Sequence, residues 1–108
     1  MQPQSEEAAW AAGFFDGEGY IGLGYGGRLE IRIVSTNKEV INYLQSKWGG
    51  SVYKRKNKNP TFDLILVSHK ETETFITKIY PFLRVKKKQV DKALELIETV
   101  KNINNKYI

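Results

Sequence analysis

The chain has 108 residues, of which 41% are hydrophobic and 12% aromatic, a size and composition that fit one folded domain with a modest core. It contains no cysteine and one histidine, which excludes disulfide frameworks, thiolate nucleophiles, cysteine-based zinc sites and a multi-histidine metal site within one chain. Lys and Arg number 17 against 12 Asp and Glu, so the net charge is +5, an excess that fits simple solubility as well as a polyanionic partner.

The basic residues gather in two clusters, at residues 54–58 and 84–88. Two separate clusters on a small domain are typical of nucleic-acid binding. An anionic membrane surface would attract the same charge, but neither cluster lies on a strongly apolar amphipathic helix. No apolar run reaches the length of a membrane span, and the N-terminal segment is acidic, unlike a signal peptide. We therefore expect a soluble, intracellular domain without a membrane partner.

The first elements in chain order are a helix and a hairpin. Ser5 followed by two glutamates predicts an N-cap, and the helix is expected over residues 6–16. Gly26 and Gly27 stand between two extended runs, which predicts a hairpin over residues 19–35. The second strand of this hairpin is apolar at every other position, as a strand with one buried face should be: Leu29, Ile31 and Ile33.

The following elements repeat this order. A second helix starts after Asn37 and ends at the glycine pair 49–50. Residues 51–68 are expected to form a second hairpin, with a turn that contains a proline. A third helix over residues 70–80 stops before another proline, and an amphipathic helix is expected over residues 87–102.

A helix followed by a hairpin, twice over, predicts a single α+β domain over residues 1–108, with a four-stranded antiparallel sheet and helices on one face. The other face is uncovered and polar. Such a face can enter a DNA major groove, or it can simply be solvated. In the strand at residues 51–57 a slip of one residue exchanges the two faces, so either Tyr53 and Arg55 or Lys54 and Lys56 lie on the uncovered side.

Residues 11–19, with the sequence AAGFFDGEG, combine three physical features. Small residues recur at a spacing of four, which lets a second helix approach closely. Phe14 and Phe15 can anchor the helix in a core. An acid-glycine-acid-glycine run then ends the helix, and a carboxylate at a helix C-terminus is electrostatically unfavourable. Such a cost points to a function, for example metal binding.

These nine residues resemble the signature of the LAGLIDADG homing endonuclease family in order and spacing, with Glu18 at the position of the second acid. The element order is similar to the αββαββα core of that family, whose antiparallel sheet is saddle-shaped, and residues 81–89 resemble the basic segment before its last helix. The resemblance covers nearly the whole chain. It implies a site-specific double-strand DNA endonuclease of a mobile intron or intein, which hydrolyses phosphodiesters and leaves staggered cuts across the minor groove.

One motif per chain implies, within this family, a homodimer whose motif helices pack at a two-fold axis. Two Glu18 carboxylates would then lie close together, and cations must offset their repulsion. The resemblance implies Mg²⁺ as the cofactor, Mn²⁺ as a substitute, and Ca²⁺ as an ion that supports binding without cleavage. It also implies a pseudo-palindromic double-stranded DNA target. The expected dimer interface consists of Ala8, Ala9, Ala12, Gly13 and Asp16.

The resemblance also implies roles for individual residues. Glu18 and the Gly17 carbonyl are expected to ligate the metal. Lys86 matches the active-site lysine, which stabilises the charged transition state, although phosphate-backbone binding would also explain it. Asn37 matches a polar residue that organises active-site water, and an N-cap of the second helix is the alternative. Ile41 stands where some relatives carry a basic residue, so we expect the active-site network to differ.

The residues expected to contact DNA lie on the uncovered sheet face and in the basic clusters. Arginine can pair with guanine, asparagine with adenine, and an acidic side chain with the cytosine amino group. The expected set is Tyr20, Tyr25, Arg28, Glu30, Arg32, Tyr53, Lys54, Arg55, Asn57, Asp63, Lys87 and Lys88.

Two other functions fit the sequence. The same fold without cleavage would serve as an RNA-splicing maturase or a DNA-binding regulator, and the presence of both Glu18 and Lys86 argues against such a loss. A small α+β dimerisation domain with a basic surface is the third interpretation. A salt titration separates it from the others, because duplex binding through phosphates weakens steeply with salt.

Overall fold

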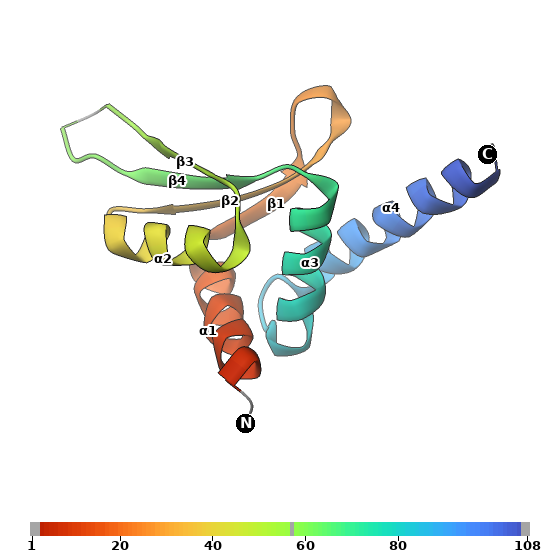
Figure 1. Cartoon of the computed structure of the whole chain (residues 1–108), viewed down its shortest axis with the longest axis horizontal. Helices are drawn as coiled ribbons and strands as arrows, with labels where there is room; N and C mark the ends of the chain where they lie inside the picture. The colour runs from red at the N-terminus through yellow and green to blue at the C-terminus, as the bar shows by residue number, and fades with distance from the viewer. Residues whose placement is uncertain (1–2, 57, 107–108) are drawn as a thin grey trace.

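A four-stranded antiparallel sheet forms one layer of the molecule, and helices lie on one side of it (Figure 1). The computed structural model describes residues 3–56 and 58–106. The α+β fold expected from the sequence is confirmed. In chain order the elements are α1 (Pro3–Glu18), β1 (Gly19–Leu23), η1 (Tyr25–Gly27), β2 (Leu29–Ser35), α2 (Lys38–Trp48), β3 (Ser51–Lys54), β4 (Phe62–Leu66), α3 (His69–Ile79), η2 (Tyr80–Phe82) and α4 (Lys87–Lys106).

Helix α1 is longer than expected at both ends. It begins at Pro3, so the expected N-cap at Ser5 is wrong. Proline is favoured in the first turn because its fixed φ angle is helical and its missing N–H is not needed there. At the other end the helix continues past residue 16 to Glu18. Glu18 is therefore the last helical residue, and Gly19 opens β1 directly after it.

The sheet has the order β1-β2-β4-β3, so the two hairpins lie side by side. Its register settles the ambiguous strand, because Tyr53 pairs with Asp63 while Leu64 pairs with Val52. Leu64 is buried beneath the helices, so Tyr53 lies on the uncovered face and Lys54 on the helix side. Regular pairing ends at Lys54, earlier than the expected end of the strand.

The hydrophobic core lies between the sheet and the helices. Phe15 of α1 and Phe75 of α3 are fully buried and meet edge to face, with ring centroids 5.6 Å apart. Trp48 at the end of α2 packs on the same Phe75 ring at 5.2 Å. The sheet contributes four fully buried side chains, which are Ile31, Ile33, Leu64 and Leu66. This packing fixes where the C-terminal end of α1 points, because Phe15 lies in its last turn.

Two glycine pairs turn the chain with positive φ angles that other residues rarely adopt. Gly26 and Gly27, with φ of 72° and 76°, form the predicted turn between β1 and β2. Gly49 and Gly50, with φ of 86° and 89°, end α2 as predicted. A Cβ atom at Gly50 would lie 2.7 Å from the carbonyl oxygen of Ile65. The turn after α2 therefore packs directly on the backbone of β4.

Helix α4 extends past its expected end at residue 102 and leaves the body of the molecule (Figure 1). Its first half is packed through Val90 and Ala93, whereas Leu96, Val100 and Ile103 remain exposed. None of the helices in the described ranges combines the length and apolarity that a bilayer crossing requires.

Candidate functional site

Glu18 is exposed at the C-terminal end of α1. The chain turns sharply there, because Gly19 lies against the Phe15 ring and a Cβ at this glycine would fall 2.1 Å from Phe15 Cδ1. The packing of Phe15 in the core and this tight turn together fix the position from which Glu18 projects. Glu18 opens onto a cleft of about 350 Å³ that is also lined by Phe14, Val34, Ser35, Thr36 and Thr61.

The hydroxyl-bearing residues of this cleft were not among the expected site residues. Thr61 Oγ1 is buried and has no hydrogen-bond partner among the described residues, which is uncommon for a buried hydroxyl. Ser35 Oγ accepts a hydrogen bond from the Asn37 backbone N–H at 3.0 Å. A signal was present in the sequence, since Ser35 ends the alternating strand β2 and Thr36 directly follows it.

The N-cap interpretation of Asn37 is confirmed. Its Oδ1 accepts a hydrogen bond from the Val40 backbone N–H at 3.1 Å, and α2 begins at the next residue. Asn37 does not line the cleft at Glu18. In this structure Asn37 therefore caps the N-terminus of α2.

Lys86 lies at the C-terminal end of α1, although it is distant from this helix in sequence. Its Nζ donates a hydrogen bond of 2.6 Å to the Asp16 backbone carbonyl and lies 5.9 Å from the centroid of the Phe15 ring. The last turn of α1 has no basic residue of its own. Lys86 supplies that charge from a distant part of the chain and offsets the negative end of the helix dipole.

The Asp16 carboxylate binds the segment before α4 instead of pointing away from its own chain. It accepts hydrogen bonds from the backbone N–H groups of Arg84, Val85 and Lys86 at 2.7, 3.1 and 2.9 Å. Burial of Asp16 favours the neutral acid, but the hydrogen bonds outweigh it and lower the pKa of this carboxyl. The hydrogen bonds to the Asp16 carboxylate therefore stabilise the fold above about pH 4, and this stabilisation is lost as pH falls through the lowered pKa of Asp16.

The oxygen donors at the end of α1 suit a hard divalent cation. They are the Glu18 carboxylate and the backbone carbonyl of Gly17, which lies past the last intrahelical hydrogen bond of α1. Within the described residues no group of three or more His, Cys, Asp and Glu side chains could hold a metal ion. A cation bound at this helix end would therefore need further ligands from outside the described residues.

The face of α1 expected to contact a second copy needs correction. Ala8 and Ala12 are buried in the core of their own chain, at 4% and 0% exposure, so they do not reach the surface. Gly13 and Gly17 are exposed, and a Cβ atom added at either glycine would meet no atom within 4 Å; Ala9 is partly exposed. The small residues on the surface are therefore Ala9, Gly13 and Gly17, at a spacing of four.

The uncovered sheet face is polar and rich in large side chains. Tyr20 and Tyr53 are exposed at 52% and 56%. Tyr20 pairs with Arg32 across β1 and β2, and Arg32 pairs with Ile65 across β2 and β4, so these residues share the face. A shallow hollow of about 420 Å³ lies there, lined by Glu30, Arg32, Ser51, Tyr53, Asp63, Ile65 and Val67.

The sequence predicted that the Asp63 carboxylate would contact a base edge. The structure instead places Asp63 beneath this face. Its side chain is 5% exposed, and Oδ2 accepts hydrogen bonds from Arg32 Nη1 at 3.2 Å and Arg55 Nη2 at 2.9 Å. Glu30 binds Arg32 from the other side at 3.3 Å. Asp63 therefore anchors two arginines that remain 34% and 52% exposed and can reach a partner.

Replacing Asp63 with Ala should lower the free energy of unfolding by about 1–3 kcal/mol, because two arginines lose a shared charged acceptor. The loss stays moderate since both guanidinium groups remain accessible to water. Urea unfolding of the two proteins measures the difference. An unchanged midpoint would show that the pairs contribute nothing to stability.

Of the other residues expected to contact DNA, some are exposed and others are not described by the structure. Lys54, Lys87 and Lys88 are exposed, and the Lys87 ammonium lies 5.0 Å from the centroid of the Tyr80 ring. Asn57 lies outside the described residues. Tyr25 is part of η1, and its side chain is not among those described.

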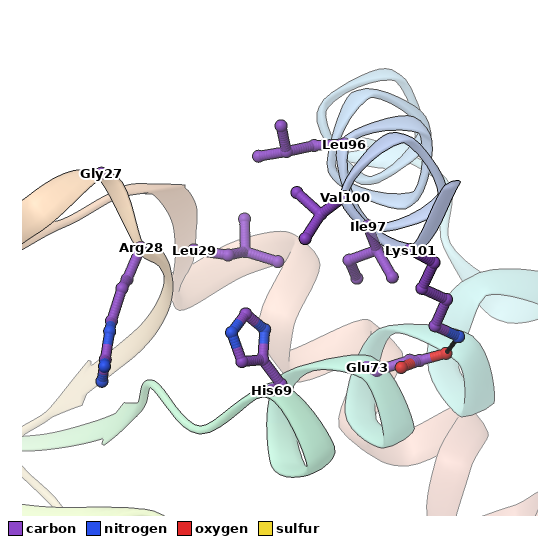
Figure 2. A pocket seen from close by; sticks show the side chains of 9 residues that line it. All are labelled: Gly27, Arg28, Leu29, His69, Glu73, Leu96, Ile97, Val100 and Lys101. Carbon is purple, nitrogen blue, oxygen red and sulfur yellow. Dashed lines mark hydrogen bonds and ion pairs between the residues drawn. The ribbon is translucent and has the colours of Figure 1, made fainter. Parts of the chain in front are cut away.

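A separate cleft of about 270 Å³ lies between the start of β2, α3 and the second half of α4 (Figure 2). Apolar side chains of β2 and α4 face it, and His69 points into it from the first turn of α3. Arg28 is at its rim, and Lys101 forms an ion pair with Glu73 beside it. Neither Glu18 nor Lys86 lines this cleft, so it does not belong to the site at the end of α1.

Solved structures of homing endonucleases share the fold. The archaeal intron-encoded homing endonuclease I-Vdi141I, complexed with DNA, has a TM-score of 0.75 at 21% identity, over 92% of this chain and 71% of that one. The group I intron-encoded homing endonuclease I-CeuI, also complexed with DNA, has a TM-score of 0.75 at 19% identity, over 94% and 58% of the two chains. At these identities the likeness concerns the fold alone.

Sequence comparison gives closer relationships. The chain is 39% identical over 64 residues to the intron-encoded RNA maturase bI4 of Saccharomyces cerevisiae, a match that covers 54% of this chain and only 10% of the maturase. Residues 5–80 match the model of the LAGLIDADG-like domain, which includes the motif helix, both hairpins and α3. Since this match extends over more than half of the chain and contains Glu18, the chain belongs to the LAGLIDADG-like domain family.

Proposed function

We propose that the chain is a homodimeric, divalent-metal-dependent endonuclease that cleaves both strands of a specific DNA site. The observation that carries this proposal is the exposed Glu18 carboxylate at the end of the motif helix, with Lys86 held at the same helix end. Phosphodiester hydrolysis requires a carboxylate that can ligate a metal ion and a positively charged group that can stabilise developing negative charge. The fold of DNA-complexed homing endonucleases supports it.

The dimer contact is proposed to run along Ala9, Gly13 and Gly17 of α1. These small exposed residues let two helix backbones approach closely around a two-fold axis. Such an approach brings two Glu18 carboxylates together, and each chain contributes its Gly17 carbonyl beside them. Bound Mg²⁺ or Mn²⁺ would neutralise the carboxylates and activate water for attack on the phosphodiester, whereas Ca²⁺ would support binding without cleavage.

The uncovered sheet face is proposed to read the DNA in the major groove. Arg32 and Arg55 are exposed and can donate paired hydrogen bonds to guanine. Tyr20 and Tyr53 are exposed beside them. Two copies related by a two-fold axis would present two such faces, so the preferred target would be pseudo-palindromic.

Lys86 is proposed to act at the scissile phosphate. Its ammonium is fixed at the C-terminal end of α1 by the 2.6 Å hydrogen bond to Asp16, and the side chain is only partly exposed. A lysine that served only as a general phosphate contact would be expected to extend into solvent, as its exposed neighbours Lys87 and Lys88 do. Its charge can stabilise the oxygen on which negative charge develops.

Selection from a randomised duplex library tests this function directly. With Mg²⁺ the protein should enrich cleaved, partly palindromic sites, and with Ca²⁺ it should enrich the same sites uncleaved. Binding should weaken steeply between low and high salt, because each phosphate contact releases counterions. Failure to enrich any duplex with either ion would overturn the proposal.

RNA splicing is a second candidate function, because the relative that matches 64 residues at 39% identity is an intron-encoded RNA maturase. In this case the basic surfaces would bind a folded intron, and Glu18 would be dispensable. Splicing assays with a structured group I intron RNA test this candidate. Splicing that depends on the protein and persists in Glu18→Gln, together with no duplex cleavage, would favour the maturase over the nuclease.

A further inference from the structure

The segment that precedes α4 has no regular secondary structure at residues 83–86, so its backbone polar groups need partners. Three of its successive N–H groups, those of Arg84, Val85 and Lys86, donate to the Asp16 carboxylate. The partners are about 70 residues apart in sequence, and the carboxylate sits where α4 begins, at the positive end of that helix dipole. One side chain of α1 thus fixes the backbone course of this segment.

Lys86 is tied to α1 by its side chain as well. Its Nζ returns to the carbonyl oxygen of the same Asp16 at 2.6 Å and lies over the Phe15 ring. Arg84 and Val85 differ, because their side chains are exposed although their N–H groups are also bound. Among the three residues, Lys86 alone has both its backbone and its charged group directed to the end of the motif helix.

We propose that Asp16 is a positioning residue for Lys86: its carboxylate holds the backbone of residues 84–86 so that the Lys86 ammonium stays beside the C-terminal end of α1. This inference rests on the proposed nuclease function for its effect on catalysis, but the positioning itself does not. Asp16 touches neither the DNA nor the reacting atoms in this arrangement. Its contribution passes through Lys86 alone, which distinguishes it from Glu18.

A double-mutant cycle tests this coupling. Asp16→Asn should lower the rate of duplex cleavage by about 10-fold to 100-fold, because a loss of positioning by about 1 Å has effects of this size. Lys86→Ala should lower it at least as much, and adding Asp16→Asn to Lys86→Ala should cause little further loss. Duplex affinity in Ca²⁺ should change by less than about threefold in all three variants, since the sheet face is untouched.

A second readout does not depend on nuclease activity. Acetylation by a limiting reagent, followed by peptide mass spectrometry, compares Lys86 with the exposed Lys87 and Lys88 in the same sample. Lys86 should react more slowly than its neighbours in the wild-type chain. Asp16→Asn should raise its rate about 5-fold to 10-fold, because a loosened segment 84–86 would release Lys86 Nζ from the backbone carbonyl of residue 16. Glu71→Gln is the matched control, because Glu71 also accepts a backbone N–H bond, from Gly50 at 3.2 Å, but lies outside the site.

The outcomes separate the two proposals. If the wild-type chain cleaves no duplex while Asp16→Asn still exposes Lys86 to acetylation, the nuclease function fails and the positioning stands. If Lys86 reacts equally in both proteins, or if Asp16→Asn lowers cleavage by the same factor with and without Lys86, the positioning is overturned. Should Asp16→Asn not fold, Asp16→Glu retains the charge but displaces the carboxylate by one methylene, and the same cycle and acetylation measurement apply to it.

Discussion

Replacing Glu18 with Gln is expected to abolish DNA cleavage while duplex binding persists. Partners that only orient a metal ligand already contribute 10-fold to 100-fold, so loss of the ligand itself should lower the cleavage rate by more than about 100-fold. Glu18 is exposed at the end of α1, so the fold should tolerate the change within about 0.5 kcal/mol. Cleavage in Mg²⁺, binding in Ca²⁺ and thermal unfolding measure the three effects.

Glu95→Gln serves as the control for this experiment. Glu95 is an exposed carboxylate on α4, away from the cleft at Glu18, so its loss should leave cleavage unchanged. Normal cleavage by Glu18→Gln would contradict the metal role of Glu18. Equal loss of cleavage in both variants would point to net charge as the cause.

Replacing Gly13 with Leu should disrupt the dimer without harm to the single chain. A Cβ at Gly13 meets no atom within 4 Å, and leucine is a better helix former than glycine by about 0.5–1 kcal/mol. In a two-fold contact, however, both copies would place a leucine between the two closely packed helices. Overpacking of this contact costs about 1–3 kcal/mol for each leucine. The dissociation constant of the dimer should therefore rise by at least about 30-fold. Analytical ultracentrifugation measures this change.

Ala12→Leu provides the contrast. Ala12 is fully buried within its own chain, so a larger side chain there should destabilise the monomer by about 1–3 kcal/mol. The two substitutions lie one position apart and should act in opposite directions on monomer stability. If Gly13→Leu forms dimers over the same concentration range as the wild-type chain, the dimer contact lies on another surface.

The fold could be predicted from sequence because its signals are local. The glycine pairs at residues 26–27 and 49–50 do mark turns with positive φ, and the apolar alternation of β2 does mark its buried face. The expected helix start at Ser5 was wrong because Pro3 offers an equally local and stronger start. The register of β3 required the structure, since both faces of that strand are polar in sequence.

The details of the site could not be predicted because they depend on contacts between distant residues. A spacing of four describes Ala8 and Ala12 as well as Ala9 and Gly13, and only packing shows which pair faces the core. Nothing near Asp16 in sequence indicates its bonds to residues 84–86. Asp63 was expected to meet a base, yet its strand position places the carboxylate under two arginines from other parts of the sheet.

In the region that the structure describes, the chain brings one exposed carboxylate and adjoining helix carbonyls to the proposed metal site. If two chains must meet to complete it, the amount of active enzyme at low expression grows with the square of chain abundance. A twofold fall in synthesis would then lower the amount of active enzyme about fourfold, and a twofold rise would raise it about fourfold. The proposed activity would thereby depend more steeply on gene dosage than the activity of a monomeric enzyme does.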